Sequence, residues 1–185
     1  MNEVIRMATI DDAEQILKIY AYYVENTAIS FECAVPTLEN FRGRIVATLK
    51  KYPYLVAERG GKILGYAYAH EFVGRAAYDW SAELTIYLDR NERQRGLGRR
   101  LYEALEENLR EMGILNLYAC IGWTEREDEF LNQNSAKFHE HLGFRRVGLF
   151  QNCGRKFGRW YDMIWMEKII GGHVENPRAV QFRRK

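Results

Sequence analysis

The order strand, glycine-rich loop, helix between residues 83 and 109 constrains the fold more than any other feature of the sequence. In residues 83–88 (ELTIYL) the aliphatic side chains recur at every second position, as on a strand with one apolar face. Glu83 then lies on the opposite, polar face. Leucines recur every four residues from Leu97 to Leu109, which predicts an amphipathic helix. The chain must therefore turn from strand into helix at Gly96 and Gly98.

The loop at residues 93–99 (RQRGLGR) has the features of a pyrophosphate site. Its glycines let the backbone approach a ligand, and the first N–H groups of the following helix point at it with the positive end of the helix dipole. A P-loop requires Lys-Ser/Thr where Arg99 and Arg100 stand, and a dinucleotide fingerprint requires a third glycine where Leu101 stands. Both are poor matches. An alternative is that the glycines only form a tight turn.

Length and composition favour one domain. At 185 residues, of which 47% are hydrophobic, the chain can bury one good core. We expect a single domain over residues 1–170 and a C-terminal tail over 171–185 that begins at Gly171 and Gly172. The net charge of +2, from 27 basic and 25 acidic side chains, argues against nucleic acid as the main partner.

The remaining composition points to a reduced, cytoplasmic protein. No apolar run approaches the ~20 residues of a membrane span, and the first residues do not open a signal peptide. Cys33, Cys120 and Cys153 are scattered, and the four histidines do not have the spacing of a metal cluster. We therefore expect no membrane partner and no metal.

Hydrophobic periodicity and turn residues predict alternating strands and helices. A capping box at Thr9 and Asp12 precedes the first helix, and a turn at Arg59-Gly60-Gly61-Lys62 joins two strands as a hairpin. The expected strands are 4–7, 54–57, 63–68, 83–88, 115–121, 146–150 and 160–167. The expected helices begin at Ala13, about Thr37, Leu97 and about Asn132, and the last ends before Gly143.

Several ordered segments together resemble the phosphinothricin N-acetyltransferase branch of the GNAT superfamily, over residues 4–168. They are Ile5-Arg6, Asn26-Thr27, Phe31-Glu32, Tyr54 to Glu58, Ala77 to Trp80, Ala82 to Leu88, Gly96 to Gly98, Asn132 with Ser135 and His139, and Lys156 to Asp162. The resemblance implies a mixed α/β fold, the GNAT acyl-CoA N-acyltransferase fold, with a central splayed sheet of about seven strands and about four helices. It also implies acetyl-CoA as the donor, a small-molecule amine as the acceptor, and a possible homodimer.

Glu83 is the candidate general base. An amine must lose a proton before it attacks a thioester, and a sheltered carboxylate can accept that proton directly or through a water molecule. Glu83 lies on the polar face of the strand that leads to the cofactor loop, and the family's catalytic glutamate falls there by motif match. The alternative is that Glu83 pairs with an arginine for structural reasons.

The resemblance also assigns cofactor contacts. Backbone N–H groups at the end of the same strand would stabilise the oxyanion and pair with the pantetheine arm like an added strand. The residues expected to bind the cofactor are Ile86, Tyr87, Leu88, Arg93, Gln94, Arg95, Gly96, Leu97, Gly98, Arg99, Asn132 and Ser135. His139 would protonate or hydrogen-bond the departing thiolate, or relay protons from the amine. A structural role for this helix-borne histidine is the alternative.

The acceptor site is less defined by the sequence. An amino acid with a phosphinate group requires cationic and hydroxyl donors around two anionic groups. Arg75 can supply a guanidinium fork and Tyr78 a phenol, while Phe31 and Trp80 can line the methylene chain. Arg75 could instead face solvent, and the two apolar rings could belong to the core.

One departure from the family pattern leaves other functions open. The connection at residues 122–131 is several residues longer than usual, and its stretch 124–129 (TEREDE) is acidic. Related enzymes accept methionine sulfone or sulfoximine. A polyamine or a protein N-terminus as acceptor is a second hypothesis, although the acidic stretch is typical of a solvated loop. A non-catalytic acyl-CoA-binding module is a third, against which Glu83 and His139 argue.

Overall fold

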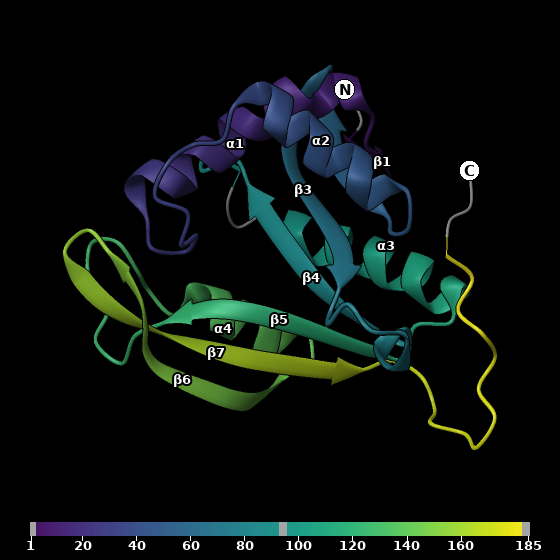
Figure 1. Cartoon of the computed structure of the whole chain (residues 1–185). Coiled ribbons are helices and arrows are strands. Elements are labelled where there is room, and N and C mark those ends of the chain that lie inside the picture. Colours follow the sequence, from purple (N-terminus) through teal and green to yellow (C-terminus); the bar gives the residue numbers. More distant parts are fainter. Residues whose placement is uncertain (1–2, 93–95, 183–185) are drawn as a thin grey trace. The chain divides into compact units, whose positions relative to one another are not determined.

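The structure is a computed structural model that describes residues 3–92 and 96–182 (Figure 1). Arg93, Gln94 and Arg95, which the sequence assigns to the cofactor loop, lie outside the described residues. Two compact units are formed, the first by Met1–Ile19, Pro36–Leu117 and Ile169–Lys185, and the second by Tyr20–Val35 and Tyr118–Lys168. The single domain expected from the sequence stays a prediction.

In the part of the chain that the structure describes, seven strands and four α-helices confirm the mixed α/β class. The strands are β1 (Glu3–Met7), β2 (Tyr54–Arg59), β3 (Lys62–Glu71), β4 (Ser81–Leu88), β5 (Asn116–Trp123), β6 (Arg145–Lys156) and β7 (Arg159–Ile169), in the sheet order β1-β2-β3-β4-β5-β7-β6. The helices are α1 (Ala13–Asn26), α2 (Leu38–Leu49), α3 (Leu97–Met112) and α4 (Asn134–His141). Short 3-10 turns occupy Ile10–Asp12 and Ala76–Tyr78.

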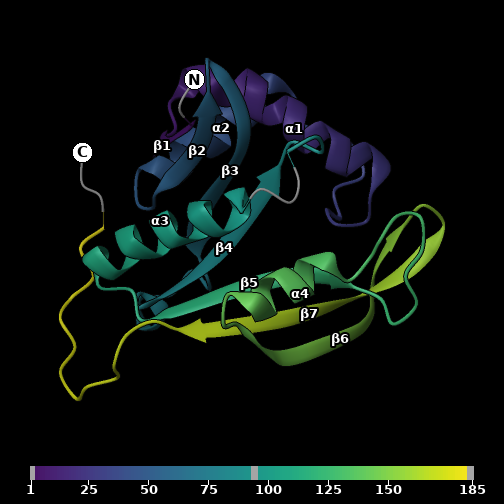
Figure 2. The same ribbon diagram turned by 180° about the vertical axis from the view of Figure 1, so that it is seen from behind.

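The first unit is an antiparallel sheet, β1 to β4, with α2 and α3 on opposite faces (Figures 1 and 2). The expected hairpin joins β2 to β3 through Gly60 and Gly61, both with positive φ angles that glycine adopts without strain. The leucine stripe of α3, from Leu97 to Leu109, is fully buried, which confirms the amphipathic helix read from the sequence. This packing fixes where α3 begins, next to the end of β4.

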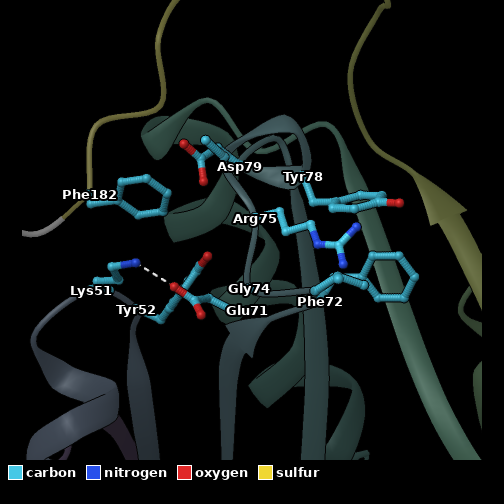
Figure 3. Close-up of a pocket in the computed structure, with 11 residues that line it drawn as sticks. Lys51, Tyr52, Glu71, Phe72, Gly74, Arg75, Tyr78, Asp79 and Phe182 are labelled. Carbon is cyan, nitrogen blue, oxygen red and sulfur yellow. Dashed lines mark hydrogen bonds and ion pairs between the residues drawn. The ribbon is translucent and has the colours of Figure 1, made fainter.

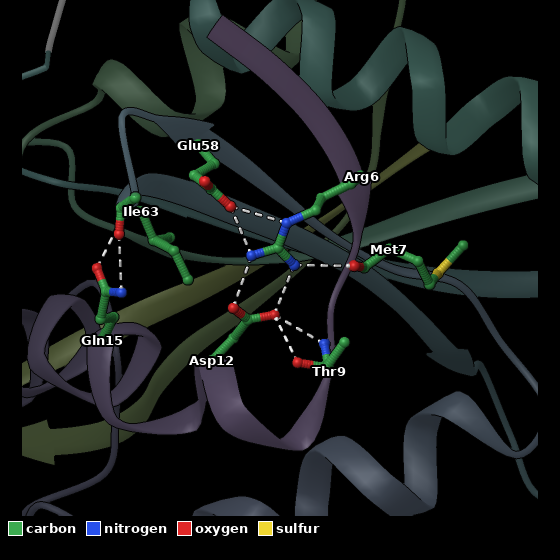
Figure 4. A network of polar contacts seen from close by, with 8 residues as sticks. Arg6, Met7, Thr9, Asp12, Gln15, Glu58 and Ile63 are labelled. Carbon is green, nitrogen blue, oxygen red and sulfur yellow. Dashed lines mark hydrogen bonds and ion pairs between the residues drawn. The ribbon is translucent and has the colours of Figure 1, made fainter.

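A buried carboxylate ties β1 to the start of the first helix (Figure 4). Arg6 in β1 donates to Asp12 at 2.7 Å and 2.8 Å and to Glu58 in β2 at 2.8 Å. The backbone N–H of Thr9 donates to Asp12 at 2.7 Å, as the expected capping box requires. The Arg6 hydrogen bonds lower the pKa of Asp12 against the opposing effect of burial. The network joins β1 to the turn that follows it and to the distant strand β2, so it fixes their relative positions.

The second unit contains α4, β6 and most of β5 and β7. Here β6 and β7 form a hairpin whose turn, Phe157-Gly158, has two positive φ angles. The strand expected at 146–150 continues to Lys156 because a bulge absorbs residues 151–153, where Asn152 adopts a positive φ and its N–H donates to Asp162 at 2.7 Å. The sequence pattern is interrupted there, so the second half of β6 was not predicted.

Helix α4 begins at Asn134, two residues after the expected start. The side-chain Oδ1 of Asn132 accepts a hydrogen bond from the N–H of Asn134 at 3.0 Å, which holds the preceding turn outside the helix. Gly143 follows the helix end with a positive φ of 88°, as expected of a residue that terminates a helix.

The C-terminal segment, residues 173–182, lies against the first unit. The N–H of Gln181 donates to the carbonyl of Met112 at 2.8 Å, and Arg178 donates to the carbonyl of Arg110 at 3.0 Å. The ring of Phe182 meets that of Tyr52 edge to face, with centroids 5.5 Å apart. The described part of the tail is therefore held along the C-terminal end of α3.

Candidate active site

Glu83 lies in β4 directly opposite His70 in β3, so their side chains share one face of the sheet. The Nε2 of His70 is 3.7 Å from Oε1 of Glu83, and 18% of the Glu83 side chain is exposed. The carboxylate is thus sheltered, with part of it in contact with solvent. Its partner is a histidine, and no arginine of the described residues is paired with it.

Burial raises the pKa of Glu83 above the usual carboxyl value, and His70 opposes this shift. Tyr102 of α3 lies beneath the same face, fully buried, and the nearby charges of Glu106 and Glu83 add to the burial that raises its pKa. A carboxyl group in such surroundings holds a proton more readily than an exposed one. That property suits a group that must accept a proton near neutral pH.

The end of β4 and the start of α3 form the expected cofactor side of the site. Ile86, Tyr87 and Leu88 are the last residues of β4, opposite Ala67, Tyr66 and Gly65 of β3. Gly96 caps α3 in the left-handed conformation, without a side-chain cap, and a Cβ there would meet nothing within 4 Å. Because no acidic residue lies in the first turn, the first N–H groups of α3 are suited to a phosphate.

Arg75 and Tyr78 lie on the exposed loop between β3 and β4 and line one cavity of about 260 Å³ (Figure 3). The guanidinium of Arg75 lies on the same side of the loop as the rings of Phe72 and Tyr78, while Lys51 and Phe182 lie on the other side. The Phe72 and Tyr78 rings meet edge to face at 5.9 Å. The structure therefore brings the two expected acceptor ligands together.

Trp80 lines a different cavity of about 310 Å³, next to the C-terminal segment. Its indole N–H donates to the carbonyl of Arg178 at 2.9 Å. The carbonyl of Trp80 accepts from the N–H groups of Leu115 and Asn116 at 2.9 Å and 3.0 Å. In this arrangement Trp80 anchors the end of the loop that carries Arg75 and Tyr78, a role that the sequence did not indicate.

His139 is buried in the second unit, with 3% of the residue exposed. Its Nδ1 is 2.7 Å from the carbonyl oxygen of Ser135, and its ring lies edge to face with those of Phe138 and Phe144. Burial lowers the pKa of His139 to about 4, against the smaller effect of the Ser135 bond. A carbonyl only accepts, so in the neutral ring Nδ1 carries the hydrogen and Nε2 keeps its lone pair.

Phe31 also lies in the second unit, on the loop after α1, and 37% of it is exposed. Its ring packs over Gly154 of β6, where an added Cβ would come within 2.3 Å of Cε2 of the ring. Lys156, which is buried, donates to the carbonyl of Ser30 at 2.7 Å. Gly154 and Lys156 therefore fix the loop that presents Phe31, and sequence reasoning assigned neither of them a role.

The acidic stretch is partly neutralised within the same unit. Arg159 of β7 donates to Asp128 at 2.9 Å and to Glu129 at 2.8 Å, and Asp128 also accepts from the hydroxyl of Tyr161 at 2.9 Å. Glu127 accepts from the N–H of Gln133 at 3.0 Å. These carboxylates stabilise the long connection, which weakens the interpretation of this stretch as a polyamine site.

No group of three or more His, Cys, Asp or Glu side chains in residues 3–92 and 96–182 could hold a metal ion. Within the same part of the chain, no helix combines the length and the apolar character needed to cross a membrane.

Comparison with known proteins gives a consistent result. The acetyltransferase (GNAT) domain family matches residues 5–165. Phosphinothricin N-acetyltransferase from Streptomyces viridochromogenes is 32% identical over 164 residues, which are 89% of this chain and 86% of that protein. The L-methionine sulfoximine/L-methionine sulfone acetyltransferase from Pseudomonas aeruginosa is 32% identical over 169 residues, 90% of this chain and 94% of that protein.

A solved structure shares the fold. The GNAT superfamily phosphinothricin acetyltransferase from Sinorhizobium meliloti, in complex with AcCoA, has a TM-score of 0.87 and 31% identity, and the match covers 96% of this chain and 94% of that one. These findings confirm the family, the fold and the co-substrate expected from the motifs. The chain belongs to the GNAT acetyltransferase family and is an acetyl-CoA-dependent N-acetyltransferase.

Proposed function

We propose that this enzyme acetylates the amino group of a small amino-acid-like acceptor, of the phosphinothricin or methionine sulfone and sulfoximine type, with Glu83 as the general base. The observation that carries the proposal is the position of Glu83: sheltered, with a raised pKa, beside an imidazole and still in contact with solvent. The relatives named for these acceptors support the substrate class.

The residues of the chain then have distinct tasks. Bound acetyl-CoA supplies the thioester carbonyl that the amine attacks. The N–H groups at Gly96, Gly98 and the start of α3 would hold its pyrophosphate, with Arg99 adding charge. Backbone N–H groups of Ile86 to Leu88 would stabilise negative charge on the carbonyl oxygen. Glu83 would take the proton that the amine loses.

The tautomer and the lowered pKa of His139 limit the roles that it can have in the reaction. Protonating the departing thiolate from Nε2 would require a charged ring, which its lowered pKa disfavours at neutral pH. The neutral ring presents Nε2 as a hydrogen-bond acceptor, because Nδ1–H is directed to Ser135. This supports a role for His139 as a neutral hydrogen-bond acceptor in the reaction, rather than as a group that carries a proton. Asn132 and Ser135, beside it in sequence, remain candidates for the pantetheine arm.

Acceptor binding is assigned to the loop between β3 and β4. The guanidinium of Arg75 can form two parallel hydrogen bonds to a carboxylate or a phosphinate, and the hydroxyl of Tyr78 lies on the same side of the loop (Figure 3). Phe31 is proposed to contact the apolar part of the acceptor, since its ring is partly exposed and held from behind.

A thiol-release assay tests the proposal. Purified enzyme and acetyl-CoA are mixed with phosphinothricin, methionine sulfone, methionine sulfoximine, ordinary amino acids, spermidine and a peptide with a free N-terminus. We expect release of CoA with the first three, at the lowest KM. Release with spermidine or the peptide alone would overturn the acceptor class. CoA binding without release from any amine would favour a binding module.

Two further predictions accompany this function. The homodimer can be checked by light scattering of the purified chain, and the cytoplasmic location by fractionation of the source cells. Both rest on the resemblance and on the composition of the sequence.

A further inference from the structure

We infer that His70 is the residue through which the proton taken up by Glu83 leaves the active site. The inference rests on the proposed function, because it requires Glu83 to be the base. It concerns a residue of β3 that the motif comparison did not single out, and it follows from the register of β3 against β4 and from the hydrogen bonds of the imidazole.

The position of His70 is set by strand pairing. In the register of the two strands, His70 is directly opposite Glu83, and the two side chains lie on the same face with Nε2 3.7 Å from Oε1. The His70 side chain is 38% exposed and that of Glu83 is 18% exposed. His70 is therefore the more exposed partner of the pair.

The orientation of the imidazole suits proton transfer. The Nδ1 of His70 is 3.0 Å from the carbonyl oxygen of Glu71, which can only accept, so Nδ1 carries a hydrogen. In the neutral ring Nε2 then presents a lone pair toward Glu83. Without a proton between them, the lone pair and the carboxylate cannot bond. With one proton, they form a charge-assisted hydrogen bond, so the pair binds a single proton as a unit.

Two tyrosines lie near the pair. Tyr68, in β3, has its ring 5.9 Å from that of His70. Tyr102 in α3 is fully buried near Glu83, with Glu106 as a further charge, and burial raises the pKa of its phenol. A phenol with a raised pKa stays protonated at neutral pH.

The proton balance is simple. The N–H bond of the ammonium acceptor breaks as an O–H bond forms on Glu83, and the freed amine lone pair forms a C–N bond to the thioester carbonyl. The C–S bond then breaks, and the departing thiolate takes the second proton that the nitrogen loses as the amide forms. The O–H bond then breaks as an N–H bond forms at Nε2 of His70. His70 releases that proton to water or to a buffer base, which returns the pair to its starting state before the next acceptor binds.

His70→Gln tests the inference, because glutamine keeps hydrogen-bonding groups but does not titrate. We expect kcat at pH 7 and low buffer concentration to fall about 10-fold, less than the ~10²–10⁴-fold effect of losing a direct general base. Added imidazole or rising buffer concentration should restore much of the rate. His70→Asn serves as a second variant, and thermal unfolding checks that both fold.

The matched control is His173→Gln. His173 contacts Asn116 at 2.8 Å and has no part in the proposed chemistry. The His173→Gln variant should retain the wild-type rate, and added imidazole should not change that rate. If His70→Gln behaves in the same way as this control, the inference is overturned.

A second readout does not depend on turnover. Because His70 opposes the rise in the pKa of Glu83, its removal should raise that pKa further. Carbon-13 NMR of the Glu83 carboxyl should then show titration at higher pH in His70→Gln than in wild type, and an unchanged titration would contradict the pairing. If wild type transfers acetyl to no amine, the proposed function fails, and this measurement still decides whether the pair exists.

Discussion

The two units hold their candidate residues in different ways. In the first unit the region of interest is strands β3 and β4, and in the second it is the region of α4, β6 and β7. Glu83 lies on a sheet face that keeps 18% of its side chain exposed, beside a titratable partner. His139 is enclosed by aromatic rings with 3% of the residue exposed. Burial favours the neutral form in both, so the pKa of the acid rises and that of the base falls.

The difference lies in access to protons. Glu83 can exchange a proton with solvent or with His70, so it can act as a base in every turnover. His139 is held in one tautomer and stays neutral across the physiological range. The surroundings of Glu83 therefore suit proton exchange, whereas those of His139 suit a fixed hydrogen-bond geometry. Each of the following predictions tests one side of this distinction.

Glu83→Gln should have the largest effect. We expect kcat to fall by ~10²–10⁴-fold, because the amide cannot accept the proton of the amine. Affinity for acetyl-CoA should remain near wild type. Steady-state kinetics and calorimetric titration with CoA measure the two quantities, and Glu107→Gln, on the exposed face of α3, is the control. If affinity for acetyl-CoA fell as much as kcat, Glu83 would act in cofactor binding rather than as a base. The distinction between the two regions would then fail.

The pH dependence of stability tests the second region. Since the pKa of His139 is lowered to about 4 from 6.5, the unfolded chain binds a proton more readily than the folded one between these values. Stability due to this histidine is complete above pH 6.5 and declines as the pH falls toward 4. The full loss is about 3 kcal/mol by the usual conversion of pKa differences. Urea unfolding at several pH values measures it.

His139→Gln should unfold with a shallower dependence on pH in this range, whatever its stability at pH 7. His141→Gln is the matched control: it lies in the same helix and its Nδ1 contacts the carbonyl of Lys137, but it is exposed. That variant should keep the slope of wild type. Equal slopes for all three proteins would show that His139 gains a proton without difficulty, and the contrast with Glu83 would fail.

The sequence predicted the first region better than the second. Alternation in residues 83–88 and the leucine stripe of α3 correctly predicted a strand that carries Glu83 and a helix that begins at Leu97. The pairing of His70 with Glu83 could not be predicted from the sequence, because the connection between β3 and β4 is too long to fix the register of the two strands. The expected strand also ended at residue 68, two positions short of His70.

The second region depends on contacts between distant segments. The bulge at Asn152 breaks the alternation of β6, so Gly154 and Lys156 could not be placed on a strand from their neighbours. Phe31 contacts Gly154 across more than a hundred residues of sequence. A motif match identified Phe31 and His139 as candidates, but only the packing shows what holds them.

Gly154→Ala should have the smallest effect on stability and tests whether packing sets the geometry of the second region. The new Cβ would meet the Phe31 ring at 2.3 Å to 2.9 Å, so the ring must move. Because Phe31 is partly exposed, it can turn aside, and we expect a cost at the low end of overpacking, about 1 kcal/mol. The larger consequence should be a raised KM for the acceptor, with the KM for acetyl-CoA unchanged.

Gly148→Ala is the matched control, because it lies in the same strand and its Cβ would come no closer than 3.9 Å to another atom. It should leave stability and both KM values unchanged. Combining Gly154→Ala with Phe31→Leu should recover the lost stability, since the smaller side chain removes the clash, while the acceptor KM stays raised. If Gly154→Ala and Gly148→Ala are indistinguishable, Phe31 is free to move, and the second region does not owe its geometry to packing at this glycine.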